Sequence, residues 1–590
     1  MRKWKGAVAA IALAGSSAVA VGATLNTRGS ASTKTGVQEW VVQYTSPAAA
    51  AKAHASIAAA GGRLTDEITT IGVARVMAGA GFAKAIAGDA GIRGVTRNRS
   101  LGNVTKGMPE VIASGRPANA PTYRTGALKT TKSLNSRRYS RSVVPDPLAA
   151  DQWDMKMLDT ARAHSRQTGR GVTVGVIDTG IDASQPDLAI NFSAALSQNF
   201  TVDRPDIDGP CADEPDQSCN DAANIDEGGH GTHVAGTIGA AKNGLGIVGV
   251  APDVTLVNLR AGQDSGYFFL FETLAAIDAA RTKHIDVVNM SFYTDPWLYN
   301  CAAPSDVLET IKLDADGNPV LDADGNPVPV DPAQLAQDIA EQQIIRTILL
   351  DAIAKAQAAG VTMVAAAGNE ATDLAAETRT DFSSPDYGAL AYARVVKKSC
   401  LDLPAEAPGV VEVSAVGPSK AKSDYSNYGT KEIDVAAPGG FFRDYFGTDK
   451  YRQPQNMILS TYPLATGQEE GGFDADGNSI DPFFVRNCNP AGVCGYYQYL
   501  QGTSMASPHA AGVAALIVGT LRSQGRTIYP AKVARILRDS AREQHCPNPR
   551  TVDYTVIGRP AEWNATCVGS GDYNNFYGSG IVNAGKAVRR

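Results

Sequence analysis

The stretch Gly502-Thr503-Ser504-Met505-Ala506-Ser507-Pro508-His509 decides how the rest of this chain is interpreted. An apolar run without charge follows it, from Ala510 to Val518, and predicts a buried helix. The positive end of that helix dipole would lie beside Ser504 and favour negative charge there. Such a serine suits acyl transfer, but Thr503 or Ser504 could equally be an ordinary helix cap. To decide between a catalytic serine and a helix cap, a base and an acid must be found elsewhere in the chain.

Pro508 lies within the first turn or so of the predicted helix. We expect it to cost little there, because N–H groups in the first turn have no partner within the helix.

The N-terminus has the three parts of a secretory signal. Arg2, Lys3 and Lys5 precede an apolar run from 6 to 21, and small residues follow it. We therefore expect residues 1–23 to be a signal peptide and the mature protein to be secreted and extracellular. The run is short for a transmembrane helix, and we expect no second apolar span of about 20 residues and no stable membrane anchor.

The composition permits a large core, since 44% of the 590 residues are hydrophobic. A net charge of −6 gives no basic footprint of the kind that binds nucleic acid.

All eight cysteines lie in the last two-thirds of the chain, and their even number predicts disulfides in an exported protein. Proximity in sequence suggests three pairs and leaves a fourth, although spacing does not prove connectivity: Cys211–Cys219, Cys488–Cys494, Cys546–Cys567 and Cys301–Cys400. A zinc site is the alternative, but none of these pairs is a Cys-x-x-Cys.

A small unit from about 37 to 101 predicts the β-α-β-β-α-β order of a ferredoxin-like α+β domain. We expect strands at 39–44, 68–77 and 92–97, and helices at 47–60 and 80–88. Alone it would be marginally stable.

Residues 102–147 predict an exposed linker, because hydrophobic periodicity stops and Pro, Ser, Thr, Gly and Asn dominate. The segment is basic, and Arg137, Arg138 and Arg141 favour proteolysis there. A nucleic-acid-binding tail is the alternative that export disfavours.

The large domain, 148–590, alternates apolar strands with helices. This order is typical of an α/β fold with a mostly parallel sheet and helices on both faces. We expect strands at 172–177, 254–259, 285–290, 361–366 and 410–416, and helices that begin near 230 or span 269–283 and 343–359. Function in such sheets gathers at the carboxyl ends of strands, where Asp178, Ser291 and Asn369 lie.

Two insertions interrupt this pattern, at about 297–341 and 440–499. Both contain Asp-x-Asp-Gly-Asn, at 314–318, 322–326 and 474–478. This resembles the start of an EF-hand calcium loop, but the distal Glu and the flanking helices are missing. We expect hairpin turns instead, which favour Asp-Gly.

Three further segments supply what Ser504 needs. They are Val176-Ile177-Asp178-Thr179-Gly180-Ile181-Asp182, Gly228-Gly229-His230-Gly231-Thr232-His233-Val234-Ala235-Gly236 and Ala365-Ala366-Ala367-Gly368-Asn369-Glu370. A serine nucleophile requires a base, and the base requires a partner that fixes its tautomer. The oxyanion requires preorganised donors.

Together these motifs resemble those of the subtilisin family of serine peptidases, in the same order and over most of residues 150 to 590. The resemblance implies a subtilisin-like fold. It implies Asp178 as orienting acid, His230 as general base and acid, and Ser504 as nucleophile. It further implies Asn369 and the Ser504 backbone N–H as the oxyanion hole.

His233 forms His-x-x-His with His230, so a metal pair is conceivable. No Glu lies between them and no third ligand is evident, so we expect His233 to be a packing residue.

The resemblance also implies a substrate cleft. Ser291 and Phe292 match the strand that forms one wall of the S1 pocket, and Gly262 and Gly266 belong to the opposite wall. An extended peptide would pair with both walls as an added strand. Tyr293 stands where the family usually has Gly, which changes the pocket.

A structural calcium site is implied as well, held by oxygen ligands. The resemblance assigns it the following residues: Asp187, Asn243, Ala241, Leu245, Ile247 and Gln152.

Residues 24–101 resemble the family's inhibitory pro-region, which would be removed by cleavage in the basic linker. We expect a secreted, monomeric, autoprocessed serine endopeptidase that acts on polypeptides, with its own pro-region as intramolecular inhibitor. We expect no further domain after the catalytic domain. The alternatives are a narrow-specificity processing or exo-acting peptidase, and a non-catalytic binding protein on the same scaffold.

Overall fold

The computed structural model describes residues 36–98, 146–205, 207–214, 217–314, 318–383 and 391–589. The expected signal peptide at 1–23 lies outside these residues. So does nearly all of the expected linker at 102–147, including Arg137, Arg138 and Arg141.

The centre of the molecule is a seven-stranded parallel sheet in the order β14-β13-β10-β8-β5-β7-β6. In chain order its strands are β5 (Thr173–Ile177), β6 (Gln198–Asn199), β7 (Thr255–Arg260), β8 (Val287–Met290), β10 (Thr362–Ala366), β13 (Val411–Val416) and β14 (Val435–Pro438). Most residues of the inner strands are apolar, and these strands are buried on both faces, as parallel sheets require. The expected α/β fold is therefore confirmed.

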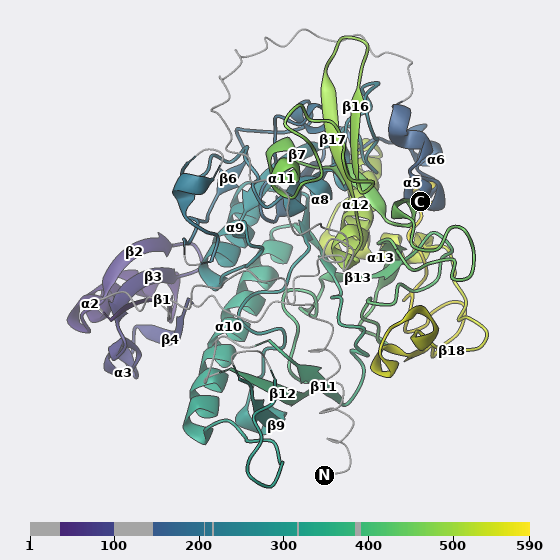
Figure 1. Cartoon of the computed structure of the whole chain (residues 1–590). Coiled ribbons are helices and arrows are strands. Elements are labelled where there is room, and N and C mark those ends of the chain that lie inside the picture. The colour runs from purple at the N-terminus through teal and green to yellow at the C-terminus, as the bar shows by residue number, and fades with distance from the viewer. Residues whose placement is uncertain are drawn as a thin grey trace.

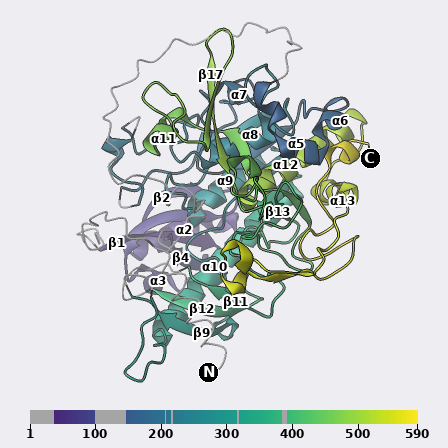
Figure 2. The ribbon, with the colours of Figure 1, turned by 45° about the vertical axis from the view of Figure 1, so that its right-hand side comes forward.

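Helices cover both faces of this sheet (Figures 1 and 2). On one face α8 (His230–Gly239), α12 (Thr503–Ser523) and α13 (Pro530–Ser540) pack on side chains such as Val174 and Val176. On the other face α9 (Leu270–Thr282) and α10 (Pro332–Ala358) pack on Ile177 and Val288. The alternation along β5 thus divides the core into two layers.

Helix α10 is longer than the sequence predicted. It begins at Pro332 rather than near 343, because Asp331 caps it by accepting hydrogen bonds from the N–H groups of Ala333 and Gln334. The expected insertion boundary at 341 therefore falls inside a helix.

Helix α12 is the one helix of the described residues that is long and apolar enough to cross a membrane. We expected no second apolar span, so that expectation was wrong. In the structure, the most apolar 18-residue stretch of this helix is 94% buried inside the protein, which makes α12 the central core helix.

The small N-terminal unit is an antiparallel sheet in the order β2-β3-β1-β4. Its elements are β1 (Val37–Tyr44), α2 (Ala50–Ala59), β2 (Arg63–Ile68), β3 (Val73–Gly79), α3 (Phe82–Ile86) and β4 (Ile92–Arg97). The expected strand at 68–77 was wrong, because Ile68 ends one strand and Val73 begins the next.

This unit packs beside α9 and α10 (Figure 1). One face of its sheet is covered by its own two helices. From the other face Val41 and Val73 enter the same apolar cluster as Leu274 of α9 and Ile348 of α10.

The two insertions contribute strands to two small sheets at opposite ends of the molecule (Figures 1 and 2). One consists of β9 (Val307–Lys312), β11 (Thr378–Asp381) and β12 (Tyr392–Lys397). The other consists of β15 (Ile458–Thr461), β16 (Phe484–Cys488) and β17 (Cys494–Leu500).

Two Asp-Gly segments of the insertions, at 322–326 and 474–478, form hairpin turns. Bridges join Leu321 to Pro327 and Phe473 to Ser479, one on each side of such a segment. The first Asp of each turn accepts a hydrogen bond from the N–H of its Asn, at 2.8 Å for Asp322 and 2.7 Å for Asp474. The aspartates thus serve the turn, as expected.

The remaining elements are short: α5 (Trp153–Leu158), α6 (Thr160–His164), α7 (Pro186–Ala189), α11 (Leu464–Glu469), β18 (Thr551–Val552), β19 (Ala565–Thr566) and α14 (Ala584–Ala587). The eight cysteines form four disulfides, namely the three pairs that sequence proximity suggested and the fourth that they left over: Cys211–Cys219, Cys488–Cys494, Cys546–Cys567 and Cys301–Cys400.

Candidate active site

Three neighbouring strands end at the same edge of the central sheet. Ile177 at the end of β5 pairs with Met290 at the end of β8, and Met290 pairs with Ala365 of β10. The residues that follow these strands therefore emerge together, and they include Asp178 and Ser291.

Asp178 and His230 form a hydrogen-bonded pair at this edge. His230 Nδ1 lies 2.7 Å from Asp178 Oδ1, and the Thr179 N–H donates to the same oxygen at 2.8 Å. The Asp178 side chain is fully buried, whereas 31% of the His230 side chain is exposed. Because Nδ1 is engaged by the carboxylate, Nε2 is the ring nitrogen left to accept a proton.

The pKa of His230 is raised by its surroundings. Burial of the ring lowers the pKa, but the charge of Asp178 and its hydrogen bond raise it, and Asp226 adds to them. The balance lies above the ordinary value, so the pair stabilises an imidazolium ion. A base that takes a proton during a reaction benefits from such a partner.

Asp226 is a positioning residue that the sequence analysis missed. Its Oδ1 accepts hydrogen bonds from Thr179 Oγ1 and the Gly229 N–H, both at 2.9 Å. Its Oδ2 accepts one from the Thr232 N–H at 2.8 Å. The loop before α8 is thereby fixed on both sides of His230. An acidic residue just before a predicted helix start is the signal that could have revealed it.

Gly231 lets the start of α8 approach the Asp178 loop. A Cβ atom at this position would collide with the carbonyl oxygen of Gly180. Any larger residue would therefore push His230 away from its carboxylate.

Ser504 lies in the first turn of α12 and is partly buried. Its Oγ donates a hydrogen bond to the carbonyl oxygen of Ser291 at 3.2 Å, which places the hydroxyl at the end of β8. Its backbone N–H, in the first helical turn, has no acceptor within the helix.

Pro508 lies further into α12 than expected. The helix begins at Thr503, so the N–H that proline lacks would have bonded to the carbonyl of Ser504. The hydroxyl of Ser291 takes that place and donates to the Ser504 carbonyl at 3.0 Å. The same hydroxyl lies 2.9 Å from Ser507 Oγ, so the end of β8 is joined to the start of the helix.

Asn369 is oriented by Thr503, the residue before Ser504. Asn369 Oδ1 accepts hydrogen bonds from the Thr503 N–H at 2.9 Å and from Thr503 Oγ1 at 3.0 Å. Thr503 Oγ1 in turn accepts one from the Gly368 N–H at 3.1 Å. With its oxygen held in this way, Asn369 keeps its NH₂ group available as a donor.

The wall expected at Gly262 and Gly266 is a tight hairpin. Gly262 bridges to Phe268, and the Gln263 N–H donates to the Tyr267 carbonyl at 2.9 Å. Gly266 occupies the left-handed turn position, with φ +87°. The hairpin starts at the site itself, because the Gly262 N–H donates to the Asp178 carbonyl at 3.1 Å.

The opposite wall is joined to this hairpin by aromatic stacking. The rings of Phe292 and Phe268 lie parallel, with centroids 3.9 Å apart. Tyr293, the departure from the family pattern, is partly buried against the apolar cluster that contains Ala367 and Leu374. Its ring therefore packs beside the segment that carries Asn369.

His233 is buried and faces away from the pair. Its Nε2 lies 3.1 Å from the carbonyl oxygens of Ile458 and Gln498, and burial lowers its pKa to about 3. A neutral ring that joins α8 to β15 and β17 agrees with the expected packing role.

The loop in which the resemblance implied calcium is closed by hydrogen bonds. Asp187 Oδ2 accepts from the hydroxyl of Tyr497 at 2.8 Å and from the Ile247 N–H at 3.1 Å, and Oδ1 accepts from Asn243 Nδ2 at 3.0 Å. Burial still raises the pKa of Asp187 to about 7, while these donors lower it. Donors thus stand at both carboxylate oxygens, where a cation would bind.

Two other expected side-chain ligands are also engaged. Asn243 Oδ1 accepts from the Leu245 N–H at 2.9 Å. The side-chain amide of Gln152 is paired with the backbone of Val248 through both its oxygen and its nitrogen. In this arrangement the side-chain ligands are taken up by hydrogen bonds, and a calcium ion would have to displace the donors at Asp187.

Comparisons with known proteins agree with this geometry. The sequence model of the Subtilase family matches residues 169–580. The chain is 28% identical to subtilisin DY of Bacillus licheniformis over 350 residues, which is 59% of this chain and 77% of that protein. It is 25% identical to a thermostable alkaline protease of Halalkalibacterium halodurans over 438 residues, 74% of this chain and 73% of the relative.

The fold resembles that of an epidermin leader peptide processing serine protease from Staphylococcus aureus, with a TM-score of 0.55 and 21% identity over 94% of this chain and 99% of the other. The family match covers well over half of the sequence. The chain therefore belongs to the Subtilase family, and it is a serine-type peptidase that acts on polypeptides.

The first prediction concerns the acid limb of the pH–rate profile. A base must be unprotonated to act, so kcat/KM of the wild type should rise with pH around a midpoint above the ordinary histidine value of 6.5. Asp178→Asn removes the charge that raises the pKa of His230 and keeps the burial that lowers it. The midpoint should move to lower pH, and kcat should fall about 10⁴-fold, as it does when the triad aspartate of a trypsin-like protease is changed to asparagine.

Initial rates on a peptide anilide between pH 5 and 9 would measure both effects. Asp539→Asn, at an exposed pair with Arg535, is the matched control and should leave the profile unchanged. A midpoint that stays in place in Asp178→Asn would contradict the assignment.

The second prediction concerns Asn369. Asn369→Leu should lower kcat about 100- to 1,000-fold with little change in KM, the loss known from removal of such a donor in a subtilisin. Thr503→Val keeps the amide but removes the hydroxyl that orients it, so its loss should be smaller. Steady-state kinetics, with thermal unfolding as a check on the fold, would test this. A rise in KM at constant kcat in Asn369→Leu would exclude an oxyanion role.

Proposed function

We propose that the protein is a secreted serine endopeptidase that cleaves peptide bonds through an acyl-enzyme on Ser504. The observation that carries the proposal is the 2.7 Å contact between His230 Nδ1 and the buried Asp178, at the sheet edge where Ser504 Oγ lies 3.2 Å from the Ser291 carbonyl. Base, orienting acid and hydroxyl are thus supplied by separate elements at one place.

The chemistry follows from these contacts. His230 Nε2 takes the proton of Ser504 Oγ as the hydroxyl attacks the carbonyl carbon of the substrate, and the imidazolium ion is stabilised by Asp178. The oxyanion is stabilised by the Asn369 NH₂ group and the Ser504 backbone N–H at the positive end of α12. The imidazolium then gives its proton to the leaving amine, and water attacks the acyl-enzyme in the reverse order.

The walls of the cleft would bind the substrate as an added strand. The edge of the hairpin 262–267 and the segment at Ser291 and Phe292 face the scissile bond from two sides. The stacked Phe268 and Phe292 rings give this cleft an apolar floor.

The small unit is the proposed pro-region, residues 24–101, acting as intramolecular inhibitor until the linker at 102–147 is cleaved. Its docking supports this role. Arg75 lies 3.2 Å from Glu272 at the start of α9 and 4.2 Å from the ring of Phe271. Asn98, the last described residue of the unit, donates to Glu272 at 3.2 Å and accepts from the Phe271 N–H at 3.2 Å. The small unit therefore ends beside the start of α9, the helix that follows the Gly262 hairpin in the chain.

Secretion agrees best with the cysteines, which form four disulfides. Disulfides form and persist in oxidising surroundings such as the outside of the cell. Residues 1–23 would direct secretion as a signal peptide.

We propose that the enzyme is a monomer after the pro-region has been removed.

A narrower processing activity is the second candidate, and the insertion at 440–499 favours it. Tyr462 packs its ring against Gly229, so that a Cβ at Gly229 would collide with it. Thr466 of α11 donates to the Glu227 carbonyl at 3.0 Å. The insertion therefore builds a wall beside His230. Hydrolysis of casein would favour broad specificity, and its absence with cleavage of single peptides would favour the narrow one.

Ser504→Ala is the direct test of the nucleophile. It should abolish peptide hydrolysis, with a loss of about a millionfold as known for a subtilisin, and it should also abolish release of the pro-region. Ser523→Ala, at the exposed end of the same helix, should keep both. Full processing by purified Ser504→Ala would exclude autoprocessing, and residual peptidase activity near the wild-type level would exclude the nucleophile.

The docking of the pro-region can be tested at Glu272, which is buried in the interface. Glu272→Gln removes the closer of the two carboxylates beside Arg75, the other being Glu39 at 3.9 Å, and breaking a buried pair costs about 3–5 kcal/mol. Maturation should become slower and the yield of active enzyme lower. Asp351→Asn removes the exposed pair with Arg93 and should have little effect, because exposed pairs contribute about 0–1 kcal/mol.

The appearance of mature enzyme over time, followed by gel and by N-terminal sequencing, would measure both variants. Equal maturation in Glu272→Gln and Asp351→Asn would contradict a role of this interface in folding or processing.

A further inference from the structure

A cavity of about 770 Å³ lies beside the starts of β13 and β14, the last two strands at one edge of the central sheet. It is lined by the loop 405–410 before β13, by residues of the segment 431–434 before β14 and by the first residues of α13. Among the described residues that line it, none was assigned to catalysis or to the substrate cleft. Its volume lies in the range of ligand sites, about 300–1,000 Å³.

Glu412 is a buried carboxylate in the wall of this cavity. Only 3% of the residue is exposed. Its Oε1 is buried and accepts no hydrogen bond from the described part of the chain. A buried carboxylate oxygen without a donor or a cation is strongly unfavourable. The ionised form of Glu412 therefore requires a positively charged partner.

Two other acids of the wall are already paired. Glu406 accepts from both terminal nitrogens of Arg379, at 2.6 and 2.7 Å. Asp434 Oδ1 accepts from Arg538 Nη1 at 2.9 Å, and its Oδ2 accepts from the Glu412 N–H at 3.1 Å. These carboxylates have their cations within the protein, so the side chain of Glu412 is the acid in this wall that is open to a new partner.

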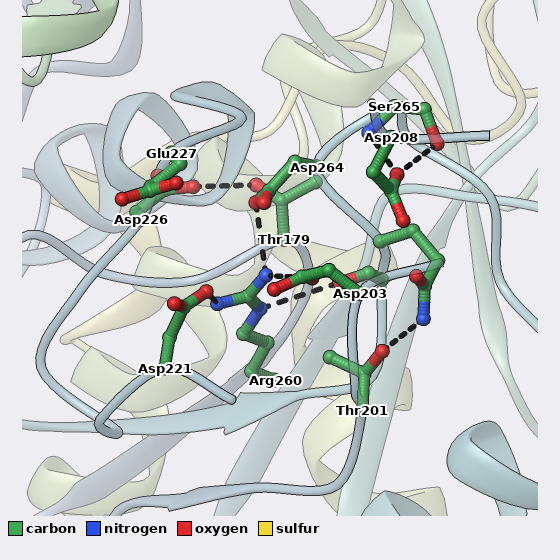
Figure 3. A network of polar contacts seen from close by, with 12 residues as sticks. Thr179, Thr201, Asp203, Asp208, Asp221, Asp226, Glu227, Arg260, Asp264 and Ser265 are labelled. Atoms are coloured by element: carbon green, nitrogen blue, oxygen red, sulfur yellow. Dashed lines mark hydrogen bonds and ion pairs between the residues drawn. The ribbon is translucent and has the colours of Figure 1, made fainter. Parts of the chain in front are cut away.

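The buried aspartates around Arg260 show how the fold places a cation among acids elsewhere. Figure 3 shows the guanidinium of Arg260 between Asp203, Asp221 and Asp264. At Glu412 Oε1, no guanidinium or ammonium group of the described residues donates in this way. A cationic partner for this oxygen would therefore come from a ligand.

The titration of Glu412 agrees with this reasoning. Burial raises its pKa well above the ordinary value, the carboxylates of Glu406, Asp402 and Asp434 raise it further, and Arg379 opposes the shift. Without a cationic ligand the carboxyl group therefore keeps its proton to higher pH than an ordinary glutamate. A positive charge beside it would favour the ionised form.

The exposed side of the cavity is basic. Lys431 is exposed, and its backbone is left-handed with φ +84°, which is unusual for a residue with a side chain. The hydroxyl of Tyr573 fixes it by accepting from the Lys431 N–H at 2.7 Å. Lys398 also lines the cavity, with its Nζ 4.0 Å from Glu432. Helix α13 adds the positive end of its dipole, because its first N–H groups have no partner within the helix.

The cavity is thus acidic at Glu412 and basic at its entrance. A ligand with an ammonium group at one end and a carboxylate at the other matches both. A short peptide with free ends is such a ligand, and a volume in the range of drug-sized ligands suits about three residues better than a single amino acid.

We propose that this cavity binds a short peptide with free ends, its ammonium group at Glu412 and its carboxylate at Lys431 and the start of α13. Short peptides with free ends are what a peptidase releases, so the site would take products of the chain's own activity. Binding itself does not depend on the catalytic mechanism proposed for Ser504.

The test uses the full-length chain with Ser504→Ala, so that peptides are not degraded. Isothermal titration at pH 6.5, where an α-amino group is still charged, is carried out with trialanine. We expect saturable binding. N-acetyl-trialanine lacks the ammonium group and should bind at least about tenfold more weakly, because it loses a charge-assisted hydrogen bond in a buried place. Trialanine amide lacks the carboxylate and should lose less, because the entrance is exposed.

Variants then locate the peptide. Glu412→Gln keeps the shape of the side chain and removes its charge, and it should lower the affinity for trialanine by at least about tenfold. Ala531→Trp should also lower it, because a large ring at the start of α13 fills the entrance. Ala531 is exposed, so this variant tests the site even if Glu412→Gln fails to fold. Ala531→Ser and Glu562→Gln, the latter at an exposed acid outside the cavity, are the matched controls and should keep the affinity.

The outcomes are distinct. Absence of saturable trialanine binding, or equal binding of N-acetyl-trialanine, would overturn the proposal. An affinity unchanged in both Glu412→Gln and Ala531→Trp would place the peptide elsewhere, for example in the substrate cleft, and would overturn this site. Equal binding of free alanine would overturn the ligand class. Failure of the serine mechanism would show instead as cleavage of a peptide anilide by Ser504→Ala, which is a separate measurement.

Discussion

The parallel register of β5, β8 and β10 is the constraint on which the site depends. Because Ile177, Met290 and Ala365 lie side by side, the loops that follow them start from one line. A shift of one residue in either pairing would turn the following side chains to the other face of the sheet. The Asp178–His230 contact and the place of Ser504 are thus set by strand pairing before any side chain is oriented.

The start of α12 is joined to this edge of the sheet by its own backbone polar atoms, which have no partner within the helix. Pro508 frees the carbonyl of Ser504, and the hydroxyl of Ser291 satisfies it. The Thr503 N–H, which has no acceptor in the helix, holds Asn369. The unsatisfied groups of a helix end normally require caps or water. Here the ends of β8 and β10 supply the partners, which makes the helix terminus and the strand ends one rigid unit.

The sequence was sufficient where signals are local. Apolar runs predicted the buried strands, and four motifs predicted Asp178, His230, Asn369 and Ser504. It failed where a partner lies far away in the chain. The hairpin within 68–77 was hidden because the apolar alternation continues through its turn. The closure of the Asp187 loop was not foreseen either, because Tyr497, whose hydroxyl donates to Asp187, follows more than 300 residues later.

Asp187 and Asp264 show how two buried carboxylates are treated differently in one fold. Both oxygens of Asp187 have donors, one of them from the insertion that carries Tyr497. Asp264 shares a single guanidinium nitrogen with Asp203, and one of its oxygens has no donor in the described chain. An insertion that supplies a hydroxyl thus satisfies one buried carboxylate, whereas the other depends on a guanidinium at the end of β7.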